Sequence, residues 1–123
     1  VGEFFEKYIM KSIGKHGEKL TKKYLEDRGY EILDENFVSR FGEIDIIAVY
    51  QKILVFVEVK SRTNLNFGYP MEFVDRRKQD KIIKTAQIYI ESKKFENIQC
   101  RFDVCEVYLS TEKINYIENA FTL

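Results

Sequence analysis

Two acidic residues and a lysine stand out because they lie in segments that are otherwise apolar. Asp45 lies in EIDIIAVY (residues 43–50), and Glu58 and Lys60 lie in ILVFVEVKS (residues 53–61). Side chains alternate between the two faces of a strand, so Glu58 and Lys60 share one face while the valines of this run share the other. A carboxylate and an ammonium group on one face of an apolar strand require a partner or a function.

A short antiparallel connection would bring these charged side chains together. Glu58 follows Asp45 by thirteen positions, and Gln51-Lys52 between the two runs predicts a tight turn. Facing residues of neighbouring strands lie about 5 Å apart. Two carboxylates that converge on a half-buried face repel each other and lose solvation, so a compensating charge is needed. Lys60 supplies one charge, and Mg²⁺ or Mn²⁺ suits hard oxygen ligands without histidine or thiolate.

Composition limits the class of protein. The chain has 123 residues, 20 of them basic and 20 acidic, and 45% are hydrophobic, which fits one globular domain. Because the net charge is zero, only the distribution of charges can indicate a nucleic-acid partner. One histidine, His16, leaves little for a zinc site or a catalytic triad. Cys100 and Cys105 are expected to be reduced thiols on opposite faces of one strand.

No long apolar run and no signal peptide are found in the sequence, so we expect a cytoplasmic protein without a membrane segment. Residues 1–13 are assigned to an N-terminal extension, because Met10 could be the true start. Residues 14–123 are expected to form a single domain.

The pattern of apolar residues and breakers predicts the order α-β-β-β-α-β-β. The expected helices cover residues 15–28 and 74–94, and the expected strands cover residues 30–38, 43–50, 53–61, 100–109 and 113–121. The first three strands should form a meander. This order is typical of an α/β domain in which helices pack on a mixed sheet.

The wider sequence resembles a known family. The segments GKHGEKLTKKYLEDRGYEIL, FGEIDIIAV, VFVEVKSRTNLNFGYP and RFDVCEV, together with the lysine-rich second helix, are similar to the YraN-like family. That family is placed in the P-D-(D/E)-x-K nuclease superfamily and resembles archaeal Holliday-junction resolvases. The resemblance covers about residues 14–121 and implies the restriction-endonuclease-like fold. Ile44 stands here where the nominal motif has proline.

The resemblance also implies roles for individual residues. Asp45 and Glu58 match the metal-binding acids, with the backbone carbonyl of Val59 as a further ligand, and Lys60 matches the catalytic lysine. Glu18, on the first helix, matches a glutamate that completes the metal site directly or through water. From the residues alone, Lys60 either positions water and phosphate or acts as a base, and the first role is favoured. Glu18 could instead only stabilise the start of its helix.

A local basic surface is expected beside this site. It comprises Arg40, Arg62, Arg76, Arg77, Lys78, Lys81 and Lys84. These side chains could contact phosphates, although a solvated helix face is the ordinary reading of such a stripe. Phe67 and Tyr69 could stack on a base or anchor their loop. Arg101 and Asp103, two apart on one strand, are expected to form a structural ion pair.

The leading hypothesis is a Mg²⁺- or Mn²⁺-dependent endonuclease that hydrolyses phosphodiester bonds in branched or otherwise structured DNA. The alternative is a nucleic-acid-binding or assembly module with the same fold and little or no turnover. Resolvase-like relatives act as dimers, so a homodimer is compatible with the first hypothesis. The sequence leaves the oligomeric state and the natural substrate open.

Overall fold

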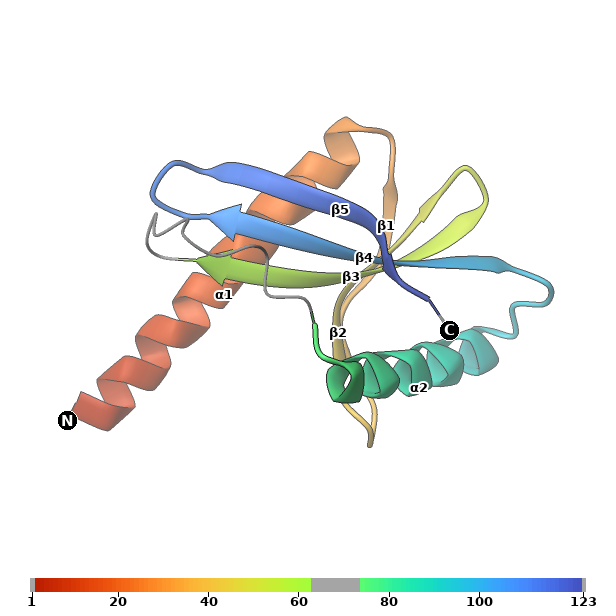
Figure 1. Ribbon diagram of the computed structural model, residues 1–123, viewed down its shortest axis with the longest axis horizontal. Helices are drawn as coiled ribbons and strands as arrows, with labels where there is room; N and C mark the ends of the chain where they lie inside the picture. Colours follow the sequence, from red (N-terminus) through yellow and green to blue (C-terminus); the bar gives the residue numbers. More distant parts are fainter. Residues whose placement is uncertain (1, 63–73, 123) are drawn as a thin grey trace.

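Five strands and two helices make up the described part of the chain. The computed structural model describes residues 2–62 and 74–122. In chain order the elements are α1 (Gly2–Asp27), β1 (Glu31–Val38), β2 (Glu43–Tyr50), β3 (Ile53–Arg62), α2 (Arg76–Lys93), β4 (Gln99–Tyr108) and β5 (Lys113–Phe121) (Figure 1). This succession confirms the predicted order α-β-β-β-α-β-β.

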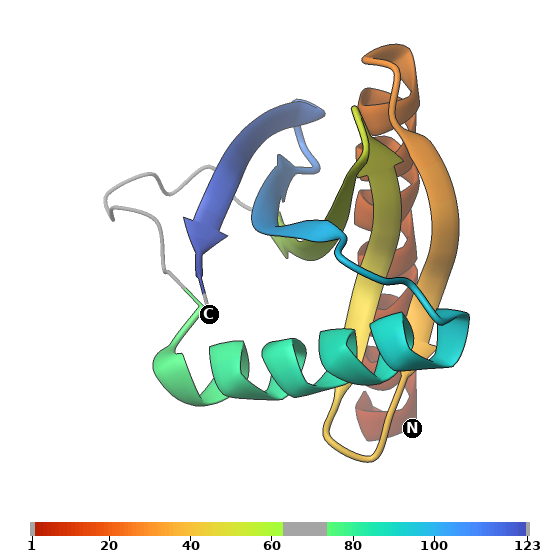
Figure 2. The ribbon, with the colours of Figure 1, turned by 90° about the vertical axis from the view of Figure 1, so that its right-hand side faces the viewer.

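All five strands belong to one mixed sheet, in the order β1-β2-β3-β4-β5. The first three strands form the predicted antiparallel meander, β4 pairs antiparallel with β5, and only β3 and β4 run parallel. Parallel neighbours need a long crossover, and here the crossover contains α2. The two helices pack against opposite faces of the sheet (Figures 1 and 2), which confirms the predicted α/β architecture.

Strand β3 contributes to two hydrophobic cores because its side chains alternate. On one face Phe56 is 1% exposed and meets Tyr89 of α2 edge to face, with ring centroids 6.2 Å apart. On the other face Val57 packs in the cluster that contains Leu25 of α1. Each fully buried side chain of this size contributes about 1.5–3 kcal/mol. The cores therefore fix β3 between the two helices, up to the position of Glu58.

Helix α1 begins much earlier than predicted, at Gly2 instead of residue 15. The prediction set residues 1–13 apart as an extension, but this stretch contains good helix formers and no proline, so nothing stops the helix. Gly14 lowers helix stability by only about 1 kcal/mol. The first turns are largely exposed, with Phe4 83% and Met10 68% accessible. The domain boundary drawn at residue 14 stays a prediction.

Helix α2 agrees with its prediction to within two residues at its start and one at its end. Asp75 is the N-cap, and its side chain accepts a hydrogen bond from the Lys78 N–H at 2.9 Å. This contact satisfies one of the N–H groups that have no partner within the helix. The helix ends at Lys93, because the C-cap residue Lys94 has a φ of 57°, outside the right-handed helical region.

Three further predictions concern the two cysteines, membrane-spanning helices and two aromatic residues. Cys100 and Cys105 carry free thiols and pack against opposite cores, as predicted. No helix within residues 2–62 and 74–122 is long and apolar enough to cross a membrane. The roles predicted for Phe67 and Tyr69 concern residues outside the described part of the chain.

We expect Gly17→Ala to destabilise the protein. A Cβ at Gly17 would overlap the Ser61 hydroxyl of β3 and lie 3.1 Å from the Ser61 Cβ, and such overpacking costs roughly 1–3 kcal/mol. Gly14→Ala is the matched control, because a Cβ there meets nothing within 4 Å and alanine adds about 0.5–1 kcal/mol of helix stability. In urea unfolding, the free energy of unfolding should be higher for Gly14→Ala than for the wild type and lower for Gly17→Ala. Equal stabilisation by both changes would contradict the close approach of α1 to β3.

Candidate functional site

The candidate site lies where β2 and β3 stop pairing. Ile46 and Val57 are the last antiparallel partners at this end, and the next residue on each strand is one of the predicted acids, Asp45 or Glu58. Asp45 Oδ2 accepts a hydrogen bond from the Val59 N–H at 2.8 Å. The Asp45 carboxylate therefore takes the place of a backbone acceptor for the Val59 N–H. This hydrogen bond holds the carboxylate between the two strands.

The carboxyl groups of Asp45 and Glu58 interact directly. Burial, then a hydrogen bond to Glu58 and repulsion by its charge, raise the pKa of Asp45 from 3.8 to about 8. The Val59 N–H and the Lys78 ammonium group act in the opposite direction without cancelling the rise. At neutral pH the pair therefore favours a proton on Asp45. The structure brings together the two acids whose spacing suggested convergence, and their role as metal ligands stays a prediction.

Glu58 has a basic partner that the sequence did not pair with it. Lys78 Nζ of α2 lies 3.1 Å from Glu58 Oε2, and the Glu58 side chain is 9% exposed. The contact does not have hydrogen-bond geometry, so within the described residues this buried oxygen has no hydrogen-bond donor. Buried carboxylate oxygens are normally satisfied. Glu58 Oε2 is therefore a buried carboxylate oxygen that could still accept a bond from a ligand.

Glu18 approaches the pair from α1 on the other side of the sheet. Burial, followed by repulsion from Asp45, raises the pKa of Glu18, and a side-chain hydrogen bond with Asn36 acts in the opposite direction. Among the described residues, however, no three acidic, histidine or cysteine side chains converge closely enough to hold a metal ion. Glu18 therefore lies within electrostatic reach of Asp45 without joining the two strand acids in one ligand group.

A hard divalent cation fits the residues that are present. The donor set consists of carboxylate oxygens, which suit Mg²⁺ or Mn²⁺. One of these oxygens, Glu58 Oε2, is buried without a hydrogen-bond donor, and the proton on Asp45 would be released on metal binding. Mg²⁺ commonly uses one or two carboxylates and keeps several waters, so two converging acids are a sufficient protein contribution.

Lys60 lies two residues beyond Glu58 on β3 and next to a carboxylate that the sequence reading missed. Its register partner on β4 is Glu106, whose side chain is 2% exposed. Glu106 Oε2 accepts a hydrogen bond from Arg62 Nε at 3.0 Å, and its Oε1 accepts one from Asn115 Nδ2 at 3.0 Å. The signal for Glu106 was available, since it is an acid in the apolar run VCEVYL. Arg62 is therefore already paired.

The predicted phosphate contacts divide into three groups. The set comprises Arg40, Arg62, Arg77, Lys78, Lys81 and Lys84. Arg62 and Lys78 are engaged by Glu106 and Glu58. Arg40 and Lys84 lie over the ring of Phe41, with 4.8 and 5.3 Å to its centroid. Within the described part of the chain, Arg77 and Lys81 make no ion pair. Their contact with nucleic acid stays a prediction.

The turn before β2 joins this basic group to α2. The hydroxyl oxygens of Ser39 and Thr85 are 2.8 Å apart, and Gly42 lies beside the Cβ atom of Lys81. The cations of the turn and of α2 are therefore neighbours in space, although the sequence separates them by about forty residues. They lie at the end of β2 that leads into Asp45.

Arg101 and Asp103 form the ion pair that was predicted to be structural. Arg101 Nη2 lies 2.8 Å from Asp103 Oδ2, and the carboxylate is fully buried. Asp103 also accepts hydrogen bonds from the Tyr116 hydroxyl at 2.5 Å and the Asn119 N–H at 2.9 Å. Tyr30 accepts a hydrogen bond from Arg101. Both oxygens of Asp103 accept hydrogen bonds, so this network joins β4 to β5 and to Tyr30 and leaves neither oxygen without a hydrogen-bond donor.

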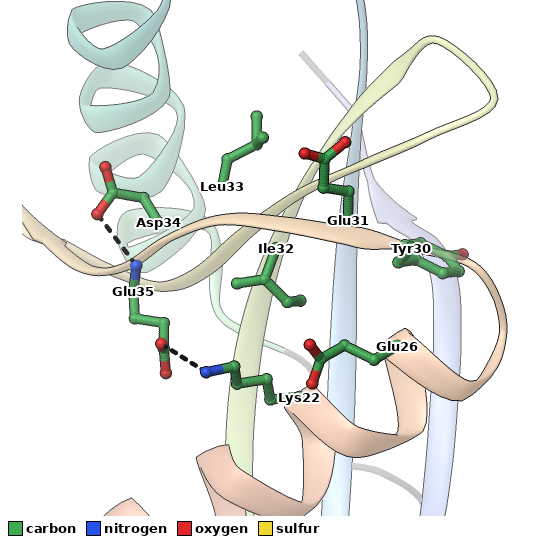
Figure 3. Close-up of a pocket in the computed structure, with 8 residues that line it drawn as sticks. All are labelled: Lys22, Glu26, Tyr30, Glu31, Ile32, Leu33, Asp34 and Glu35. Carbon is green, nitrogen blue, oxygen red and sulfur yellow. Dashed lines mark hydrogen bonds and ion pairs between the residues drawn. The ribbon is translucent and has the colours of Figure 1, made fainter.

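A surface hollow lies apart from the carboxylate pair, between the last turns of α1 and β1 (Figure 3). Its lining residues are Lys22, Glu26, Tyr30, Glu31, Ile32, Leu33, Asp34 and Glu35. Lys22 pairs with Glu35 at 3.1 Å, which leaves three acids in the lining without a lysine or arginine partner there. A hollow of this charge disfavours a phosphate, and it contains none of the predicted site residues.

Fold and site together define a small α/β protein with one mixed sheet and a largely buried carboxylate pair where two strands separate. Residues 17–107 match the model of a family described as "Uncharacterised protein family UPF0102". The chain belongs to this family.

Its relatives extend over nearly the same length. A UPF0102 protein of Caldanaerobacter subterraneus subsp. tengcongensis is 51% identical over 121 residues, which cover 94% of this chain and 99% of the relative. One from Clostridium beijerinckii is 53% identical, with 95% and 98% covered, and one from Dictyoglomus turgidum is 47% identical, with 90% and 98% covered. These similarities show the family and leave the activity to be argued from the site.

The raised pKa of Asp45 predicts how the stability of the metal-free protein depends on pH. The folded state binds this proton more tightly than the unfolded state, so the contribution is complete below about pH 4 and is lost as the pH rises to about 8. Asp45→Asn removes the titration and keeps the side-chain size. In urea unfolding with a chelator, the wild type should lose free energy of unfolding relative to Asp45→Asn across this range.

Asp27→Asn, which removes an exposed carboxylate at the end of α1, controls for the loss of one negative charge. A difference between wild type and Asp45→Asn that does not change with pH would contradict the raised pKa of Asp45.

Proposed function

We propose that this protein is a divalent-metal-dependent endonuclease that hydrolyses phosphodiester bonds in DNA, as a cytoplasmic member of the P-D-(D/E)-x-K superfamily. The observation that carries the proposal is the convergence of Asp45 and Glu58 at the separating ends of β2 and β3. Lys60 follows Glu58 on the same face of β3, as the superfamily motif requires. An acidic pair with an adjacent lysine is a combination suited to a metal and a phosphate.

The proposed ligands of the cation are Asp45 and Glu58, with Glu18 and the Val59 carbonyl as further oxygens, directly or through water. When bound, Mg²⁺ or Mn²⁺ supplies charge that polarises a phosphate oxygen and lowers the pKa of a water. The Val59 N–H holds Asp45 in place with its 2.8 Å hydrogen bond. Such a fixed side chain needs little reorganisation when the ligand arrives.

Lys60 is assigned to positioning water and phosphate. In the described part of the chain it makes no ion pair, so its ammonium group is available to a phosphate oxygen. Its neighbour Arg62 is held by Glu106 and can act only where that ion pair places it. A lysine that stays charged orients water and offsets negative charge in the transition state without first losing a proton.

Recognition of DNA would use charge and shape. Arg40, Arg77, Lys81 and Lys84 form a basic group around the start of α2 and the turn before β2, on a protein with no net charge. Contacts of this kind hold the phosphate backbone and carry little base specificity. Branched or otherwise structured DNA is the proposed substrate class, and cleavage of two strands is compatible with a homodimer.

A nucleic-acid-binding module with little or no turnover is the second candidate. It is favoured by one observation, that Glu18 does not converge with Asp45 and Glu58 into a three-residue ligand group within the described residues. On this reading the basic group binds DNA and the acidic pair only shapes the surface. Metal-dependent turnover separates the two candidates.

The test is cleavage of linear, single-stranded, flap and four-way DNA in Mg²⁺ or Mn²⁺. We expect product from the wild type, none from Asp45→Asn, and a loss of about 10²-fold or more for Lys60→Met, the size typical of a lost transition-state contact. Binding should be measured on the same substrates with Ca²⁺ in place of the active metal, so that loss of turnover is distinguished from loss of affinity.

Lys52→Met, a lysine change in the β2–β3 turn, is the matched control and should retain full activity. Activity that survives both site substitutions would indicate a contaminating nuclease. DNA binding that does not depend on metal, with no cleavage of any substrate, would exclude the enzyme and support the binding module.

A further inference from the structure

Lys78 occupies a position that is unfavourable for a lysine unless it has a specific partner. It lies in the first turn of α2, directly after Arg76 and Arg77, and this turn contains no acidic residue. Cations are disfavoured at a helix N-terminus because the helix dipole is positive there. Arg76 is compensated by Asp80 of the same helix, at 3.3 Å. Lys78 instead reaches across to the sheet.

Its partner is a buried carboxylate oxygen of the candidate site that has no hydrogen-bond donor among the described residues. Lys78 Nζ lies 3.1 Å from Glu58 Oε2, and the Lys78 side chain is 51% exposed whereas that of Glu58 is 9% exposed. A buried carboxylate without a nearby cation is strongly destabilising. The contact nevertheless lacks hydrogen-bond geometry and leaves Oε2 without a donor among the described residues. The Lys78 ammonium group therefore compensates the charge of Glu58 but does not donate a hydrogen bond to Oε2.

We propose that Lys78 is the resident counter-ion of Glu58 in the metal-free protein and that a divalent cation displaces it on binding. This inference rests on the proposed function, because it takes Asp45 and Glu58 as the metal ligands. It assigns Lys78 to the site itself, whereas Arg77 and Lys81 on the same helix belong to the surface around it. Lys78 then controls how tightly the site binds its metal.

Charge balance is the reason for displacement. A divalent ion balances the charges of Asp45 and Glu58, and a lysine retained on Glu58 would add positive charge directly beside the ion. An ion bound to Oε2 and the ammonium group that contacts the same oxygen would repel each other. The lysine side chain is half exposed and can move into water without leaving a cavity. Metal binding thus competes with the ion pair and is weakened by it.

The test is the affinity of the metal-free protein for Mn²⁺, measured by isothermal titration calorimetry. Lys78→Met should bind Mn²⁺ about tenfold more tightly than the wild type, because the substitution removes the cation that competes for Glu58 Oε2. Lys81→Met, one turn further along the same helix face and without contact to Glu58, is the matched control. It removes the same charge and should change the affinity less than twofold.

A second measurement takes account of the loss of folding stability that is expected when Glu58 has no cation beside it. Thermal unfolding of Lys78→Gln, with and without saturating Mn²⁺, should show a larger metal-induced rise in Tm than the wild type shows. Lys78→Arg, which keeps a cation, should behave as the wild type does in both experiments.

The possible outcomes separate this inference from the proposed function. If the wild type binds Mn²⁺ and Lys78→Met binds it equally or more weakly, Lys78 supports Glu58 and the displacement is wrong, while the metal site stands. If the variant binds and the wild type does not, the counter-ion role is supported in its strongest form. If neither binds, the metal centre itself fails, and this inference fails with it.

Discussion

The site depends on one electrostatic constraint, the placement of two carboxylates in a half-buried gap between strands. Asp45 and Glu58 lie where the β2–β3 pairing ends, and burial, together with the proximity of Glu58, raises the pKa of Asp45 to about 8. The Val59 N–H and the Lys78 ammonium group partly offset the free-energy cost of burying these two carboxylates. Such an arrangement contributes nothing to folding that an apolar pair would not supply better, which makes a ligand the simplest reason for its presence.

The topology of the sheet explains why two helices meet this gap. Because β3 and β4 are parallel, the chain must cross over between them, and the start of α2 then lies near the end of β3, with Lys78 facing Glu58. Helix α1 packs on the opposite face through Gly17 and brings Glu18 toward the same gap. The candidate site is therefore assembled from two strands and from helices on both sides of the sheet.

Two of the buried acids in the described part of the chain, Asp103 and Glu58, differ in how well their oxygens are satisfied. Both oxygens of Asp103 have hydrogen-bond donors, from Arg101, Tyr116 and Asn119, as is usual for a structural ion pair. Glu58 Oε2 has a cation nearby but no hydrogen bond among the described residues. Sequence pattern alone ranks these acids alike, since each interrupts an apolar strand. The hydrogen-bond donors around each carboxylate distinguish the structural network of Asp103 from the candidate ligand site at Glu58.

The sequence by itself determined the order of elements, the meander and the pairing of Asp45 with Glu58. These follow from local rules, namely the period of two along a strand and the short turn between neighbours. Only the tertiary structure decided the partners of Lys78 and Arg62 and the distance of Glu18 from the acidic pair. Those features depend on packing between segments far apart in the chain, where side-chain direction and burial, and not residue spacing, determine which charges meet.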